Sequence, residues 1–202
     1  MLAPGPRAIR TIDNIKDATR EVFLRRGYSG TTVDEIASVA GVSRASFYTY
    51  FPSKREVLIA VGEASSVECG AAISRLATVD PSLKGIEGWV REYFSILDVH
   101  GSFAFAWTQA AAEDEVIQTA GMRAHLRLCR RLGDNLGTLV GLPHPDPKIL
   151  GLTALGMLDR SWDFARQYSN ALDRSAVEAQ VARMIWGAIR PVAARARVPQ
   201  RP

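Results

Sequence analysis

The stretch Thr31–Lys54 constrains the fold of this chain most, because it holds two short helical patterns separated by a three-residue turn that begins with a glycine. In the first pattern, residues 33–40, apolar side chains recur at helical spacing, and the hydroxyl of Thr31 or Thr32 can cap its N-terminus. Gly41 then ends the helix, since glycine adopts a positive φ at little cost. The stretch therefore begins with one short helix and a tight turn.

A second short helix is predicted over residues 44–50. Ser43 can cap its N-terminus, and Pro52 ends it because the residue before a proline is displaced from the α region. Phe47 and Phe51 lie four residues apart and are expected to be buried anchors. Two short helices joined by a tight turn are typical of a helix-turn-helix, whose second helix enters the major groove of DNA.

The other side chains of the second helix are suited to contact DNA. Arg44, Ser46, Tyr48 and Thr49 can all form hydrogen bonds to phosphates or base edges. Ala45 is small and lets the backbone approach closely. This surface therefore predicts binding to double-stranded DNA.

In its N-terminal quarter the sequence resembles the TetR/AcrR family of bacterial transcriptional regulators. The matching positions are Ala18, Phe23, Gly27-Tyr28, Thr32-Val33, Ile36-Ala37, Ala40-Gly41-Val42-Ser43, Phe47-Tyr48, Tyr50-Phe51 and Ser53-Lys54. The resemblance implies an all-α fold of about nine helices. It implies a three-helix DNA-binding domain over residues 1–55 and a ligand-binding and dimerisation domain over residues 56–202. The implied DNA-contacting residues are Thr32, Ser43, Arg44, Ala45, Ser46, Tyr48, Thr49, Tyr50 and Lys54.

Charge is unevenly distributed along the chain. The whole chain carries +4, whereas residues 1–55 alone carry +4, the last thirteen residues carry a further +4, and the remainder carries −4. A basic N-terminal segment on a mildly acidic body suits a polyanionic partner for that segment. A chance asymmetry of the surface is the alternative.

The rest of the chain predicts helices throughout. The expected segments are 8–26, 53–77, 83–99, 103–112, 122–140, 147–168 and 173–190. A helix break at His100-Gly101-Ser102 is expected between the segments 83–99 and 103–112. Gly62 and Gly70 each weaken the helix over residues 53–77 by roughly 1 kcal/mol relative to alanine. Lys54, in the first turn of that helix, is placed to bind phosphate.

The last two predicted helices are apolar almost all round, and in a chain of this size a second subunit is the natural cover. We therefore expect a homodimer through residues 147–168 and 173–190. Gly151 and Gly156 are interpreted as close-packing points in the first of these helices.

Large apolar side chains gather in the C-terminal domain, which is typical either of an ordinary core or of an apolar ligand pocket. The family resemblance implies a small effector there. The order of helices and the Trp…Phe-Ala spacing near Trp162 are similar to regulators of the ethionamide-activation repressor type, with long apolar pockets. The candidate ligand-binding residues are Trp89, Tyr93, Phe94, Phe103, Trp107, Met122, Leu126, Met157, Trp162 and Trp186.

Motifs for other chemistry are weak. The three histidines are far apart and no zinc-binding pair occurs, so neither a metal nor a cofactor is expected. Glu113, Asp114 and Glu115 are interpreted as solvated acids, and we expect no enzyme. Cys69 and Cys129 are expected to be free thiols. No stretch approaches the length of a membrane span, which favours a soluble, cytoplasmic protein.

The predicted function is a ligand-responsive repressor that an apolar or amphipathic effector releases from its operator. Two alternatives stay open at this point: a helical ligand-binding protein without DNA binding, and a transcriptional activator of the same family.

Overall fold

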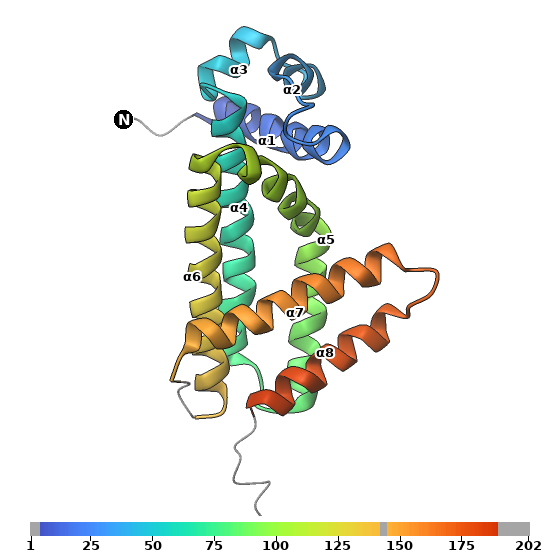
Figure 1. Cartoon of the computed structure of the whole chain (residues 1–202). Helices are drawn as coiled ribbons and strands as arrows, with labels where there is room; N and C mark the ends of the chain where they lie inside the picture. Colours follow the sequence, from blue (N-terminus) through green and yellow to red (C-terminus); the bar gives the residue numbers. More distant parts are fainter. Residues whose placement is uncertain (1–4, 142–144, 190–202) are drawn as a thin grey trace, which may run out of the picture. The chain divides into compact units, whose positions relative to one another are not determined.

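The computed structural model describes residues 5–141 and 145–189, and Figure 1 shows its helices in chain order. Within these residues the chain forms eight α-helices and one short 3-10 helix, with no strand, which confirms the all-α fold class. The elements are α1 (Pro6–Arg26), α2 (Val33–Val39), α3 (Arg44–Tyr50), α4 (Lys54–Arg75), η1 (Leu76–Thr78), α5 (Leu83–Glu113), α6 (Glu115–Leu139), α7 (Pro147–Gln167) and α8 (Arg174–Ile189). His144 and the basic segment 190–202 lie outside the described residues.

Two predicted interruptions are wrong. Helix α5 continues through His100-Gly101-Ser102, so residues 83–99 and 103–112 belong to one helix. The predicted gap between residues 112 and 122 is also too long, because helix α6 begins at Glu115 and runs through Gly121. A glycine inside a helix costs about 1 kcal/mol relative to alanine, which packing of the flanking side chains readily offsets.

The chain divides into two compact units. Unit 1 comprises residues 1–67 and 100–124, and unit 2 comprises residues 68–99 and 125–202. Helices α4, α5 and α6 each continue from one unit into the other. Unit 1 thus contains the predicted DNA-binding segment 1–55 together with the end of α5 and the start of α6. The functional boundary at residue 55 stays a prediction.

The core of unit 1 brings α1 and the helix-turn-helix together with the start of α4 and the α5–α6 segment. Its fully buried members include Ile15, Val22, Ile36, Phe47, Val57, Leu58, Val61 and Ile117. Trp107 of α5 lies where a Cβ on Gly62 of α4 or on Gly121 of α6 would collide with its indole ring. Both glycines therefore make room for this tryptophan, which explains why two helices tolerate them.

Unit 2 has its own apolar core, in which α7 and α8 pack as an antiparallel pair (Figure 1). Leu155 and Ile185 are 1% and 2% exposed, so both belong to this core. Gly151 packs against the backbone of Cys129 on α6, as predicted for a close-packing point. Gly156 does not: a Cβ there would meet nothing within 4 Å, because this position faces outward.

Within the described residues, one helical segment is long and apolar enough to cross a membrane by length and composition alone. This segment, Lys54–Thr78, corrects the expectation that no stretch approaches that length. Of its most apolar window, 44% is buried inside the protein. Buried Val57, Leu58 and Ile73 supply part of that apolar content.

Candidate nucleic-acid interface

Local hydrogen bonds build the helix-turn-helix. The hydroxyl of Thr32 accepts from the backbone N–H of Glu35 at 3.2 Å and caps α2, while the hydroxyl of Ser43 accepts from the N–H of Ser46 at 3.0 Å and caps α3. Gly41 adopts a φ of 67° between them. Thr31, the other predicted cap, instead buries its side chain and donates to the carbonyl of Gly27 at 2.7 Å.

Helix α3 has one buried face and one exposed face. Phe47 is completely buried, and its ring contacts that of Phe51 with centroids 6.0 Å apart, which confirms both as anchors. On the opposite face Arg44, Tyr48 and Thr49 are exposed. Exposed Ala45 and partly exposed Ser46 and Tyr50 complete the predicted α3 set. The hydrophobic anchors therefore orient the polar side chains toward solvent.

Arg44 already has intramolecular partners. Its guanidinium forms an ion pair with Asp34 of α2 and lies 5.5 Å from the centroid of the Tyr48 ring. Both charged side chains are more than half exposed, at 58% and 62%. An exposed pair of this kind is weak, so phosphate oxygens or a base edge can replace Asp34 as the partner.

Lys54 has a structural role that the sequence did not indicate. Its ammonium donates to the carbonyls of Tyr28 at 2.8 Å and Thr31 at 3.1 Å, and lies 4.4 Å from the centroid of the Tyr28 ring. These contacts tie the start of α4 to the turn that precedes α2. Phosphate binding by Lys54 stays a prediction.

Acidic residues at the α5–α6 turn form hydrogen bonds with residues on either side of the helix-turn-helix. The hydroxyl of Ser29 donates to Glu113, and Nε of Arg55 donates to Asp114 at 2.6 Å. A Cβ on Gly27, whose φ is 69°, would collide with Gln109 of α5. The interpretation as solvated acids holds for Glu113 and Glu115, which are exposed, whereas Asp114 is only 12% exposed and pairs with Arg55.

The ten candidate ligand-binding residues do not form one cluster within a unit. Phe103, Trp107 and Met122 belong to unit 1, and the others belong to unit 2. Residues Trp89, Tyr93, Phe94 and Trp162 are buried in the core of unit 2, where Met157 and Trp186 are only partly buried. Met122 and Leu126 are exposed at 56% and 37%. Their role in binding a ligand stays a prediction.

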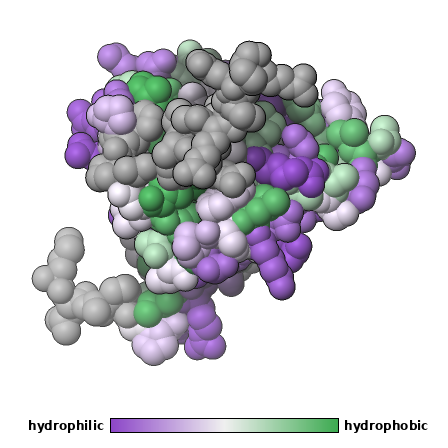
Figure 2. All heavy atoms as spheres, turned by 90° about the horizontal axis from the view of Figure 1, so that it is seen from below, coloured by the Kyte–Doolittle hydropathy of each residue, from purple (hydrophilic) through white to green (hydrophobic). Residues whose placement is uncertain are grey.

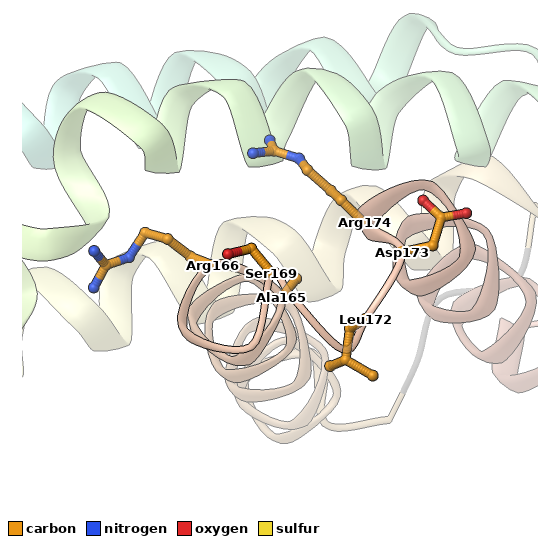
Figure 3. Close-up of a pocket in the computed structure, with 6 residues that line it drawn as sticks. All are labelled: Ala165, Arg166, Ser169, Leu172, Asp173 and Arg174. Carbon is orange, nitrogen blue, oxygen red and sulfur yellow. The ribbon is translucent and has the colours of Figure 1, made fainter.

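Two hollows in the described surface are lined by other residues. One lies beside Arg25, Arg26 and Gly30. The second lies at the α7–α8 turn, and Figure 3 shows Arg174 extending from it toward the neighbouring helix. Arg174 is already paired there, donating two hydrogen bonds of 2.9 Å to Asp98 on α5. Its positive charge is therefore neutralised.

An apolar stripe runs along the outward face of the α7–α8 pair. Among its side chains, Ile149 is 49% exposed, Leu152 39%, Phe164 41% and Met184 54%. In Figure 2, green apolar atoms lie among purple ones toward the right edge, where Figure 1 places the α7–α8 turn. The two helices thus present apolar side chains both to the core and to solvent, as their patterns predicted.

Comparison with known sequences identifies the N-terminal region. The model of the family described as bacterial regulatory proteins, tetR family, matches residues 15–61. The HTH-type transcriptional regulator SrpR of Pseudomonas putida is 48% identical over 54 residues, 27% of this chain and 25% of SrpR. The HTH-type transcriptional repressor NicS of Pseudomonas putida is 32% identical over 92 residues, 44% of this chain and 43% of NicS. The chain therefore spans less than half the length of these relatives.

Solved structures match nearly the whole chain. The fatty acid degradation regulator FadR from Bacillus halodurans has a TM-score of 0.72 at 21% identity, covering 94% of this chain and 99% of that one. FadR from Bacillus subtilis in complex with stearoyl-CoA has a TM-score of 0.65 at 18% identity, covering 88% and 99%. At such identities the likeness establishes the fold. The matched segment and its helix-turn-helix geometry identify residues 15–61 as a region of the TetR/AcrR family of transcriptional regulators.

Proposed function

We propose that this protein is a cytoplasmic, ligand-responsive repressor that binds operator DNA as a homodimer and is released by an apolar or amphipathic effector. The observation that carries the proposal is the two-faced α3, in which Phe47 is fully buried while Arg44, Tyr48 and Thr49 are exposed. Polar side chains on a helix held by such anchors can enter a major groove without loss of core packing.

The contacts divide by chemistry. Arg44 and Ser46 read base edges, because they lie in the first turn of α3 and the N-terminal residues of a recognition helix contact bases. Tyr48, Thr49 and Lys54 bind phosphate, which sets register and contributes affinity for any sequence. The caps Thr32 and Ser43 add hydroxyl groups at two helix N-termini, where backbone dipoles favour a phosphate.

Dimerisation through α7 and α8 covers the exposed apolar stripe. Gly156 on α7 and Gly187 on α8 have open space around their Cβ positions, so a second subunit can approach closely at both. A two-fold dimer binds two half-sites when its recognition helices lie roughly 34–36 Å apart. Operator binding therefore depends on the separation that the dimer imposes.

Effector control follows from the continuity of three helices. Because α4, α5 and α6 each have one end in unit 1 and one in unit 2, a change of helix packing in unit 2 reaches unit 1 through unbroken backbone. An effector that favours an arrangement with wrongly spaced recognition helices lowers operator affinity by its differential binding free energy. The same effector raises the melting temperature, since it binds only the folded protein.

Binding to the DNA upstream of the protein's own gene tests the proposal. In a gel-shift titration at fixed salt, wild type should bind this DNA more tightly than an unrelated duplex. Arg44→Ala should weaken specific binding about tenfold, within the range for a lost base contact. Arg130→Ala is the matched control, because Arg130 is 74% exposed on α6 in unit 2. Failure to bind either duplex would favour the helical ligand-binding protein without DNA binding, and equal affinity for both would contradict operator recognition.

A reporter assay tests the direction of regulation. Deleting the gene should raise transcription from the bound promoter if the protein is a repressor, as NicS is named. A fall in transcription would instead favour an activator. The HTH-type transcriptional activator FasR of Mycolicibacterium smegmatis is 50% identical to this chain over 44 residues.

A further inference from the structure

The carboxyl group of Asp159 lies against the apolar core of unit 2, where a single side chain among the described residues donates a hydrogen bond to it. Asp159 of α7 accepts from the hydroxyl of Tyr93 on α5 at 3.4 Å, which is long for an O–H···O bond of about 2.7–2.8 Å. The ion pairs in the described part of the chain include none that involves Asp159. Its neighbour Arg160 on the same helix instead pairs with Asp163 at 3.1 Å.

In the described part of the chain, the titratable groups that interact with Asp159 come from three other helices and are neutral. They are Cys69 of α4, Tyr93 of α5 and Cys129 of α6. Burial, reinforced by the charge of Asp159, raises the pKa of Cys69 to about 12 and also raises the pKa values of Tyr93 and Cys129. None of the three therefore supplies a positive charge to the carboxylate.

The remaining surroundings are apolar and aromatic. Trp89 stacks on Tyr93 with ring centroids 5.5 Å apart, and Leu155, Leu158 and Trp162 of α7 are almost completely buried. Desolvation in this environment raises the pKa of Asp159 to about 7, while the hydrogen bond from Tyr93 opposes the shift. Asp159 is nevertheless partly exposed, so a ligand can reach it. A carboxylate of this kind gains most from a cation that brings its own apolar surface.

We infer that Asp159 and Tyr93 form the polar end of the effector site, and that the effector is an organic monocation with an apolar body. A hydrophobic amine or a quaternary ammonium ion has this chemistry. Its charge pairs with Asp159, and its apolar body packs among the side chains of unit 2. An anionic acyl chain is disfavoured by the like charge. This inference rests on the proposed function in taking unit 2 as the effector-binding part.

Three probes with the same ten-carbon chain test the headgroup. Decyltrimethylammonium, decanol and decanoate are titrated into the full-length protein by calorimetry at about pH 8.5, where Asp159 is ionised. The cation should bind about tenfold more tightly than decanol, as expected for a charge-assisted contact, and decanoate should bind most weakly.

Asp159→Asn tests the residue. This change preserves the shape and removes the charge, so the cation should bind no more tightly than decanol. Asp134→Asn on α6 is the control, since Asp134 is 53% exposed and pairs with Arg130 outside the cluster. This control should keep the wild-type preference.

If Asp159→Asn fails to fold, the pH dependence of cation binding by the wild type tests the same residue. Lowering the pH to about 5.5 protonates a carboxyl whose pKa is raised to about 7, so the preference for the cation should largely disappear. Cys69, Tyr93 and Cys129 stay neutral throughout this range, because their pKa values are raised.

Equal binding of the three probes, a preference that survives Asp159→Asn, or failure of every probe to bind would overturn this inference. Operator affinity is measured on the same samples. If the cation binds and operator affinity stays unchanged, the proposed derepression is contradicted, whereas the cation site at Asp159 is still supported. Absence of specific operator binding, with the cation preference intact, overturns only the proposed regulatory function.

Discussion

Nε of Arg55 on α4 donates to Oδ2 of Asp114 at 2.6 Å, which joins the helix after the helix-turn-helix to the α5–α6 turn within unit 1. The other oxygen of Asp114 accepts from the backbone N–H groups of Val116 at 3.0 Å and Ile117 at 3.3 Å. One carboxylate thus caps α6 and holds α4. Asp114 is therefore a structural link between the DNA-binding segment and the α5–α6 turn.

This link predicts an acid-sensitive contribution to stability. Desolvation alone raises the pKa of Asp114, but hydrogen bonds from Arg55, Ile117 and Val116 outweigh it, so the folded-state pKa is lowered. The stabilisation is therefore present above the unfolded pKa of about 4 and is lost as the pH falls through the folded pKa. Asp114→Asn keeps the helix cap and loses the ion pair. Its melting temperature should depend less on pH between about 2 and 5 than that of wild type.

Thermal melts of wild type and Asp114→Asn across this pH range check the expectation. Asp134→Asn is the control, because its exposed partner Arg130 is 3.8 Å away and contributes little. An acid dependence in Asp114→Asn as steep as in wild type would show that the Arg55 pair does not stabilise the fold.

Lys54→Ala should weaken binding to every DNA sequence. If Lys54 neutralises one phosphate in each subunit, the slope of log affinity against log salt falls by about one per subunit. Gel shifts at several salt concentrations measure it, with Lys84→Ala in unit 2 as the control. A weaker affinity at an unchanged slope would mean that Lys54 acts only by holding the carbonyls of Tyr28 and Thr31.

Gly156→Arg should dissociate the dimer without unfolding the subunit. A side chain at Gly156 meets nothing within 4 Å in the subunit itself, whereas in the proposed dimer it would place an unpaired charge in the interface. Gly88→Arg on α5 is the matched control, since its surroundings are equally open. Sedimentation should show monomers only for Gly156→Arg. A wild type that sediments as a monomer at micromolar concentration would contradict the dimer itself.

Gly121→Ala should destabilise the protein although alanine favours helices. Its Cβ would collide with the indole of Trp107, and such overpacking costs about 1–3 kcal/mol. Gly88→Ala has open space and should stabilise by up to about 1 kcal/mol. Denaturant titrations compare the two variants. Similar stabilities would show that Trp107 moves freely, in which case larger residues at position 121 could be used to probe an effector pocket.

The sequence by itself determined the helix-turn-helix. The caps Thr32 and Ser43 and the turn at Gly41 act over three or four residues, so their effect is visible in the sequence without knowledge of the fold. The spacing of Phe47 and Phe51 likewise predicted a buried face. The family resemblance and the all-α class followed from these short-range signals together with helical periodicity.

Only the tertiary structure decided which residues distant in sequence meet. Arg55 and Asp114 are 59 positions apart, and Tyr93 and Asp159 are 66 apart, so no local pattern connects them. Tertiary packing also carried α5 and α6 through glycines that looked like helix ends. Tertiary packing also decided that Leu155 lies in the core and Leu152 on the surface. Both are leucines on one helix with two apolar faces, and those faces differ only in what covers them.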